Sequence, residues 1–381
     1  MNLSPPPIFI VGAPRSGTTL LAAMFGAHSN YAAGPESQFF SKLNADMLDA
    51  AIDPSDWPNK AVETLAGLTL ADQPVLELFD TDKAQARERL EQQSPSIAAV
   101  LEALTIPFAE KRGKSGWVEK TPNHLCNLPQ IRALWPKARI IRIVRDPRDS
   151  VVSTCKLPTF SNSALANAYI WREWQETGEP FFKTDPLATT IRYEDMIASP
   201  ESELRKLCEQ IDIQFDPAML QFQNAASDVS SEGESWKAQV SSTLDPSRVF
   251  VWKTNLDKSI ADAVSLVCHE WLLHFGYDAG DAPVRTVPAF GLSPAFVERF
   301  EPVMLRDATF KVRWIEAPDI ANAHHVFDHP RYYRFRSPAK LARLALGRRF
   351  AGRQLKKTAK WQAAMEKAPA QTHPANAAGQ S

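Results

Sequence analysis

IFIVGAPRSGTT, residues 8–19 of the 381-residue chain, joins a short apolar run to a glycine-rich turn. Ile8 to Val11 is continuously apolar and rich in β-branched and aromatic residues, which is typical of a strand buried on both faces. A helical pattern follows from Thr18 to Ala27. In this order of strand, glycine loop and helix, backbone N–H groups and the helix N-terminus form a cradle for an anion. The segment therefore predicts an α/β domain with a phosphate-binding loop.

The residue types within the loop distinguish it from the phosphate loop of nucleotide triphosphatases. Gly12 and Gly17 allow close backbone approach, and Thr18 and Thr19 offer hydroxyl donors in the first helical turn. The Gly-x-x-x-x-Gly spacing matches that of nucleotide triphosphatases, but Thr18 stands where those proteins place a lysine. Arg15 supplies the cation instead, and no apolar strand ends in a clear magnesium-binding aspartate.

Further apolar runs alternate with helical patterns along the chain. We expect strands at 116–119, 139–144 and 189–193, and helices at 81–92, 97–111, 130–134, 164–176, 201–211 and 260–275. Alternating strands and helices predict a P-loop-type, three-layer α/β domain with a central parallel sheet flanked by helices. We expect this domain to span 1–280, with a helical insertion without a clear strand at 39–114, a C-terminal extension at 281–337, and a basic helix with a disordered tail at 338–381.

Charge is distributed unevenly, although the formal net charge is −1. Residues 331–367 carry twelve lysines and arginines against one glutamate, and the rest of the chain carries 31 basic and 43 acidic residues. A basic helix of this kind is typical of contact with an anionic membrane surface or an acidic partner, and docking onto the acidic body is the alternative. Nucleic acid is not an expected partner, because no recognisable binding module is present.

Cysteines and apolar runs indicate the cellular setting. The four cysteines are far apart and form neither a Cys-x-x-Cys pair nor a cluster with histidine, so we expect neither a disulfide scaffold nor a zinc site. The first twelve residues have no basic region typical of a signal peptide, and no run approaches the roughly 18 apolar residues of a membrane span. We expect a soluble cytoplasmic protein, with peripheral contact at the inner membrane surface as a further possibility for the basic tail.

A second candidate anion site is IVRDPRDSVVS, residues 143–153. Arg145 stands at the end of the expected strand, and Ser153 lies in the next helix. Because strand carboxyl ends form the ligand crevice of an open parallel sheet, we expect both residues to face the same crevice as the first loop. A guanidinium group and a hydroxyl suit a doubly charged phosphate. The alternative is a turn held by local salt bridges.

The PRSGTT loop resembles the 5′-phosphosulfate loop of sulfotransferases that use 3′-phosphoadenosine 5′-phosphosulfate (PAPS), especially the bacterial and tyrosylprotein branches. The resemblance extends over residues 7–278. It implies PAPS as co-substrate, with Arg15 steadying the bridging oxygen as the sulfate departs. We expect no metal, because a sulfuryl group carries less negative charge than a phosphoryl group and fixed arginine and lysine side chains can replace the metal. It implies cofactor-binding roles for Arg15, Ser16, Gly17, Thr18 and Thr19 at the 5′-phosphate, and for Arg145 and Ser153 at the 3′-phosphate.

The resemblance also implies the reacting groups. Glu36 in AAGPESQFF matches the general base of the tyrosylprotein branch, and Lys120 in WVEKTPNHL matches the lysine that contacts the transferring sulfuryl group. His124 is the alternative base, although cytosolic sulfotransferases place their histidine two residues after the lysine rather than four.

Two further segments resemble nucleotide contacts of the family. Tyr193 in IRYEDMIASP would lie near the nucleotide, or alternatively pack at a strand end against the core. In SRVFVWKTNL, Arg248 is our candidate for the 3′-phosphate, with Lys237 and Lys253 as alternatives.

The resemblance thus implies in-line sulfation of an acceptor hydroxyl. The acceptor could be a small molecule, a sugar, a lipid or a peptide tyrosine. Two alternatives remain open: a P-loop small-molecule kinase or nucleotide triphosphatase, and a non-catalytic nucleotide-binding protein recruited through its basic tail.

Overall fold

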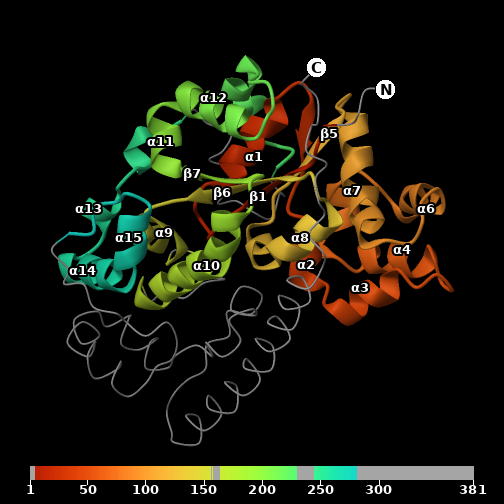
Figure 1. Ribbon diagram of the computed structural model, residues 1–381, viewed down its shortest axis with the longest axis horizontal. Coiled ribbons are helices and arrows are strands. Elements are labelled where there is room, and N and C mark those ends of the chain that lie inside the picture. Colours follow the sequence, from red (N-terminus) through yellow and green to blue (C-terminus); the bar gives the residue numbers. More distant parts are fainter. Residues whose placement is uncertain (1–4, 156, 158–163, 230–243, 281–381) are drawn as a thin grey trace, which may run out of the picture. The chain divides into compact units, whose positions relative to one another are not determined.

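A computed structural model describes residues 5–155, 157, 164–229 and 244–280 (Figure 1). The expected extension at 281–337 and the basic helix at 338–381 lie outside these residues. The centre of the fold is a five-stranded sheet in the order β2-β5-β1-β6-β7, with every neighbouring pair parallel. The strands are β1 Ile8–Val11, β2 Tyr31–Ala33, β5 Gly116–Glu119, β6 Arg139–Val144 and β7 Ala188–Arg192. All four β1 residues are fully buried, as their continuous apolar character predicts.

Helices cover both faces of the sheet, which confirms the three-layer α/β prediction. On one face lie α1 (Thr18–Ala27), α11 (Tyr193–Ala198), α12 (Pro200–Gln210) and the 3₁₀ segment η2 (Pro217–Ala225) (Figure 1). Their buried side chains form one apolar cluster with Ile8, Ile10, Ile141 and Ile143 of the sheet. The other face carries η1 (Pro122–Asn127), α8 (Leu128–Leu134) and α10 (Ala164–Thr184). There Phe9, Trp117 and Trp135 pack with ring centroids 5.2–5.9 Å apart.

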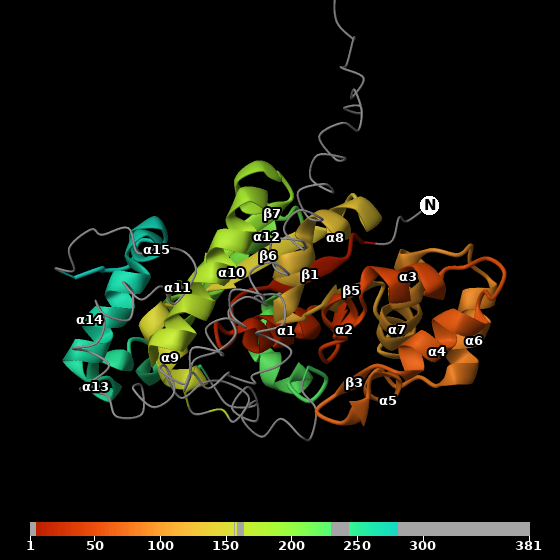
Figure 2. The same ribbon diagram turned by 90° about the horizontal axis from the view of Figure 1, so that it is seen from below.

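The chain between β2 and β5 is mostly helical, and α7 contacts both of these strands. Its helices are α2 Phe39–Lys42, α3 Ala45–Ala51, α4 Asn59–Ala66, α5 Val75–Leu78, α6 Lys83–Glu91 and α7 Ile97–Lys111 (Figure 2). One expectation for this region is wrong, because Thr69–Leu70 (β3) pairs antiparallel with Gln73–Pro74 (β4). The hairpin turn places Ala71 and Asp72 at φ values of 48° and 65°. Two left-handed residues are what a tight two-residue hairpin requires.

The last described segment packs beside α9 (Pro147–Thr154) and α10. It contains η4 (Pro246–Arg248), α13 (Trp252–Asn255), α14 (Lys258–Val267) and α15 (His269–His274). The single helix expected over 260–275 is therefore two helices, which break at Cys268. Within the described part of the chain, no helix is both long and apolar enough to span a bilayer.

Candidate functional site

The predicted site residues gather at the carboxyl edge of the sheet. The glycine loop follows β1, Glu36 follows β2, Lys120 follows β5, Arg145 follows β6 and Tyr193 follows β7. Because all five strands are parallel, these five chain segments emerge on the same edge, where open α/β sheets bind their ligands.

The geometry of the first loop depends on its glycines. A Cβ atom at Gly12 would lie 2.5 Å from the main-chain oxygen of Ile143. Gly17 has a φ of 99°, and a Cβ there would lie 2.5 Å from the Tyr193 ring. Arg15, between them, is also left-handed, with a φ of 66°. The loop is therefore held close to β6 and Tyr193 in a strained conformation of the kind found at ligand sites.

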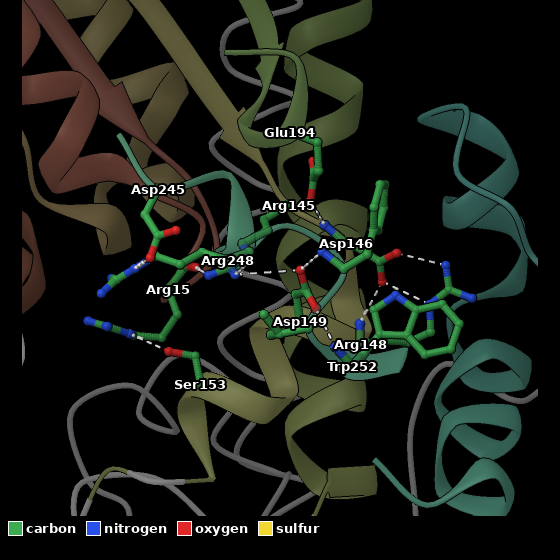
Figure 3. Close-up of polar contacts among 12 residues, drawn as sticks. Arg15, Arg145, Asp146, Arg148, Asp149, Ser153, Glu194, Asp245, Arg248 and Trp252 are labelled. Atoms are coloured by element: carbon green, nitrogen blue, oxygen red, sulfur yellow. Dashed lines mark hydrogen bonds and ion pairs between the residues drawn. The ribbon is translucent and has the colours of Figure 1, made fainter. Parts of the chain in front are cut away.

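Arginines from the two predicted anion sites meet at this edge (Figure 3). The Arg15 Nε atom donates to Ser153 Oγ at 2.9 Å, and Arg145 Nη1 donates to the Arg15 carbonyl oxygen at 3.3 Å. Arg145 Nη2 donates to the Arg248 carbonyl oxygen at 2.7 Å, and its guanidinium lies 4.6 Å from the centroid of the Tyr193 ring. The structure thus brings together the phosphate loop and all four later residues expected to contact the nucleotide.

Acidic residues of α9 hold this arrangement in place (Figure 3). The fully buried Asp149 accepts the backbone N–H groups of Phe250 and Trp252 at 2.7 and 2.9 Å, and lies 3.5 Å from Arg145. Burial raises the pKa of Asp149, and the neighbouring Arg145 opposes this effect. Asp146 forms a two-point ion pair with Arg148. The local salt bridges considered as an alternative therefore coexist with an Arg145 that faces the loop.

Unsatisfied donors indicate that the site suits an anion. Among the described residues, Ser16 Oγ and Arg145 Nε are buried polar atoms without a hydrogen-bond partner. Buried polar atoms are rarely left unpaired in native proteins, so such donors are candidates for ligand contacts. The first turn of α1, which begins at Thr18 and includes Thr19, has no side-chain cap. Helix N-terminus, orphaned donors and guanidinium groups together fit a phosphorylated ligand.

The other nucleotide candidates lie in different surroundings. The side chain of Arg248 pairs with Asp245 at 3.2 Å, and 39% of it is exposed. The Lys253 ammonium lies against the rings of Phe250 and Trp252. Lys237 lies outside the described residues. Of the two candidates that lie among the described residues, Arg248 contacts Arg145, and it does so through its main-chain oxygen.

Glu36 and Lys120 form an ion pair of 3.0 Å between Oε1 and Nζ. The lysine side chain is fully buried and that of Glu36 is 13% exposed. The second carboxylate oxygen of Glu36 accepts a hydrogen bond of 2.7 Å from Gln38 Nε2. A partly accessible carboxylate beside a buried ammonium can accept a proton while the cation stabilises negative charge.

His124 lies close to this pair in the chain but is fully buried. Its Nδ1 atom lies 2.7 Å from Glu119 Oε2, and its Nε2 atom accepts the Phe40 backbone N–H at 3.2 Å. Both ring nitrogens are therefore engaged by protein groups, which favours Glu36 as the base. Sequence reasoning missed Glu119; its place directly before Lys120 is the only signal that pointed to it.

Clusters of three or more metal-ligating side chains are absent from the residues that the structure describes. The candidate site is thus built from guanidinium, ammonium, hydroxyl and backbone N–H donors with one accessible carboxylate.

Comparisons with known proteins agree with this chemistry. A family model described as "Sulfotransferase family" matches residues 6–217. A putative protein-tyrosine sulfotransferase of Caenorhabditis briggsae is 25% identical over 219 residues, which cover 56% of this chain and 68% of that protein. Omega-hydroxy-beta-dihydromenaquinone-9 sulfotransferase Stf3 of Mycobacterium bovis is 26% identical over 253 residues, covering 55% and 63%. The solved sulfotransferase domain from the curacin biosynthetic pathway has the same fold, with a TM-score of 0.53 and 23% identity over 72% of this chain and 98% of that one.

Proposed function

The chain belongs to the sulfotransferase family, and from this premise we propose that it transfers a sulfuryl group from PAPS to an acceptor hydroxyl. The matched residues 6–217 include the phosphate loop, Glu36, Lys120, Arg145 and Tyr193. The observation that carries the proposal is the pair of contacts between the two anion segments: Arg145 donates to the Arg15 carbonyl, and the Arg15 side chain donates to Ser153, so both guanidinium groups lie at one edge of the sheet. A nucleotide phosphorylated at both its 5′ and 3′ positions needs two such groups.

The proposed donor site assigns each half of the nucleotide to one set of residues. Arg15, Ser16 and Gly17 to Thr19 would hold the 5′-phosphosulfate through side chains and backbone N–H groups. Arg145 and Ser153 would hold the 3′-phosphate, with Arg248 beside them. The orphaned Ser16 Oγ and Arg145 Nε support this division, since each set contains one buried donor that a phosphate could satisfy.

PAPS supplies an activated sulfuryl group whose transfer leaves adenosine 3′,5′-bisphosphate. The protein's own part is positioning and charge stabilisation, as in phosphoryl transfer. Glu36 accepts the proton of the acceptor hydroxyl as its oxygen attacks in line. Lys120, which is buried beside Glu36, and Arg15 stabilise the negative charge that moves from the acceptor side to the departing phosphate oxygen.

The relatives support a hydroxyl as the group that is sulfated. By their names, one acts on protein tyrosine and another on an ω-hydroxylated dihydromenaquinone. A phenol and an alkyl alcohol share only the hydroxyl, and a carboxylate base is suited to both. We propose a hydroxyl-bearing acceptor for this chain on the same ground.

Two measurements test the function. Calorimetric titration with adenosine 3′,5′-bisphosphate should show saturable binding, and radiolabelled sulfate should pass from PAPS to at least one member of a panel of phenols, alkyl alcohols, sugars and tyrosine peptides. Binding without any transfer would favour the non-catalytic alternative. Magnesium-dependent ATP turnover without PAPS consumption would favour the kinase alternative.

A further inference from the structure

The Glu36–Lys120 ion pair joins two loops at a point beyond the end of the pairing between strands β2 and β5. Strands β2 and β5 remain in register to the pair Ala33 and Val118. Glu36 and Lys120 lie beyond that point, on loops that are far apart in the chain. The backbone pairing between β2 and β5 therefore does not extend to the two charged groups, and side-chain contacts bridge the loops that carry them.

A single buried carboxylate joins the two loops. Glu119 is 1% exposed. Its Oε1 atom accepts Ser37 Oγ–H at 2.7 Å and Thr121 Oγ1–H at 2.6 Å. Its Oε2 atom accepts the Thr121 backbone N–H at 3.2 Å and lies 2.7 Å from His124 Nδ1. Ser37 belongs to the loop of Glu36, whereas Thr121 and His124 follow Lys120.

Each of the three side chains that meet Glu119 also accepts a backbone N–H group near the start of α2. Thr121 Oγ1 accepts from Gln38 at 3.3 Å, Ser37 Oγ accepts from Phe39 at 3.3 Å, and His124 Nε2 accepts from Phe40 at 3.2 Å. Each of these three successive backbone N–H groups is thus linked to the Glu119 carboxylate through one intervening side chain. We call Ser37, Glu119, Thr121 and His124 the Glu119 relay.

The direction of every bond in the relay follows from the carboxylate. An ionised carboxylate only accepts hydrogen bonds, so both hydroxyls and His124 Nδ1 must donate to it. Their remaining lone pairs then face the backbone N–H groups, and His124 is neutral with its proton on Nδ1. Burial by itself raises the pKa of Glu119, and the hydrogen bonds that its carboxylate accepts from His124, Thr121 and Ser37 oppose this effect.

We propose that Glu119 is a positioning residue that holds the Glu36 carboxylate against Lys120 by orienting the relay. The inference rests on the proposed function, in which Glu36 takes the acceptor proton. Glu119 itself is too deeply buried to meet a substrate, and it acts through the loop of residues 36–40.

The test replaces Glu119 by glutamine, whose NH₂ group must face at least one of the relay donors. We expect Glu119→Gln to bind adenosine 3′,5′-bisphosphate within twofold of the wild type and to lose about 100-fold in kcat, as misplacement of a reacting group by an ångström does. The matched control is Glu102→Gln on α7, which alters a carboxylate that accepts a hydrogen bond from the indole N–H of Trp135. This control should leave kcat unchanged.

Two readouts do not depend on turnover. Hydrogen-exchange mass spectrometry over residues 37–42 should show faster exchange in Glu119→Gln than in the wild type and the control. Nitrogen chemical shifts of His124 should show the proton on Nδ1 in the wild type and a changed tautomer population in the variant. A wild-type His124 with its proton on Nε2 overturns the relay, whatever the enzyme does.

Thr121 provides a second route if Glu119→Gln fails to fold. Thr121→Val removes the hydroxyl at nearly constant shape and should lower kcat at least tenfold, whereas Thr121→Ser keeps the hydroxyl and should restore it. Equal kcat in both, or parallel losses of kcat and nucleotide affinity, would overturn the positioning role. Absence of sulfuryl transfer in the wild type would instead count against the proposed function, and the exchange and nitrogen measurements would still decide whether the relay exists.

Discussion

Arg145 is held by two main-chain oxygens as well as by the side chains of Asp149 and Tyr193. Its two terminal nitrogens donate to the carbonyl oxygens of Arg15 and Arg248, and its guanidinium lies over the Tyr193 ring. Its guanidinium is therefore positioned by several neighbours at once. We propose that Arg145 contributes to nucleotide binding, and removing Arg145 alone measures that contribution.

We expect Arg145→Ala to weaken binding of adenosine 3′,5′-bisphosphate by 1.5–3 kcal/mol, or about 10- to 150-fold, because a charge-assisted contact to phosphate is lost. Isothermal titration calorimetry measures this directly. The control is Arg89→Ala, which removes a surface arginine paired with Glu110 on another helix. Unchanged affinity in Arg145→Ala would remove Arg145 from the nucleotide site.

Glu36→Gln separates binding from chemistry. The amide keeps the size of the side chain but cannot take a proton, so we expect nucleotide affinity within twofold and a fall in kcat of about 100-fold or more. Glu63→Gln, which disrupts a surface pair with Lys83, is the matched control. Substantial remaining turnover would transfer the role of base to His124, and His124→Asn would then abolish it.

Loop motifs and family segments pointed to Arg15, Arg145, Glu36 and Lys120 as candidates, and the structure adds that Glu36 and Lys120 form an ion pair. The Glu119 relay could not be found in the same way. Ser37 and Thr121 are ordinary loop residues in the sequence, and their roles exist only once chain positions more than 80 residues apart are side by side. Hydrogen-bond networks between loops leave no periodic pattern to read.

The strands β1, β5 and β6 were predicted, and nearly all of their residues are buried, although only β1 is a continuous apolar run. The fourth expected strand, at 189–193, is shifted by one residue, because Tyr193 already begins α11. The short strand β2 was missed. Its three residues Tyr31–Ala33 carry little strand preference of their own, and their extended conformation depends on pairing with β5.

Close packing of the phosphate loop against β6 and α11 leads to a prediction at Gly17. Gly17→Ala combines a left-handed φ of 99° with a Cβ 2.5 Å from the Tyr193 ring, so we expect a loss of stability and a weaker nucleotide complex. Gly113→Ala is the matched control, since its φ is 66° but nothing lies within 4 Å of the new Cβ. It should cost only about 1–2 kcal/mol of backbone strain. Calorimetry and thermal melting compare the two, and wild-type affinity in Gly17→Ala would contradict the packing argument.

Helix α10 carries Glu173, and the titration of its carboxyl group should change the free energy of unfolding. Burial, with a smaller contribution from the charge of Glu176, raises the pKa of Glu173 from 4.5 to about 8. The native state therefore keeps a proton that the unfolded chain releases, and the free energy of unfolding should fall as pH rises from 4.5 to 8.

Replacing this carboxyl by an amide removes that dependence. We expect the free energy of unfolding of Glu173→Gln to equal that of the wild type near pH 4.5. At pH 8.5 it should be about 2–4 kcal/mol higher than that of the wild type, as measured by urea titration. Glu91→Gln, on the exposed surface of α6, should change neither value. Equal free energies of unfolding of Glu173→Gln and the wild type at pH 8.5 would show that ionisation of Glu173 does not destabilise the native state.

A distant part of the chain packs at the edge of the sheet where we propose that the nucleotide binds. Residues 244–280 dock on α9 through Asp149, which accepts two of their backbone N–H groups, and on α11 through a hydrogen bond of 2.7 Å from Tyr277 to Glu194. This docking brings the Arg248 carbonyl to Arg145. Stability of the segment and affinity for the nucleotide should therefore change together.

Asp149→Asn tests that coupling. The amide leaves one of the two N–H groups without an acceptor, which should cost about 1–3 kcal/mol in unfolding and weaken nucleotide binding as well. Asp262→Asn alters an exposed ion pair with Lys258 in the same segment and should do neither. A destabilised Asp149→Asn protein that binds the nucleotide normally would show that the segment's docking does not affect the site.

The parallel strand order also affects how one can tell that a refolded preparation is native. Arg15 and Ser153 are 138 residues apart in sequence, Arg145 and Arg248 are 103 apart, and Glu36 and Lys120 are 84 apart. Such distant contacts form slowly and late during refolding. Catalytic competence should therefore return only after circular dichroism has regained its final value, which makes turnover a stricter quality check on a preparation than any spectroscopic signal of helix content.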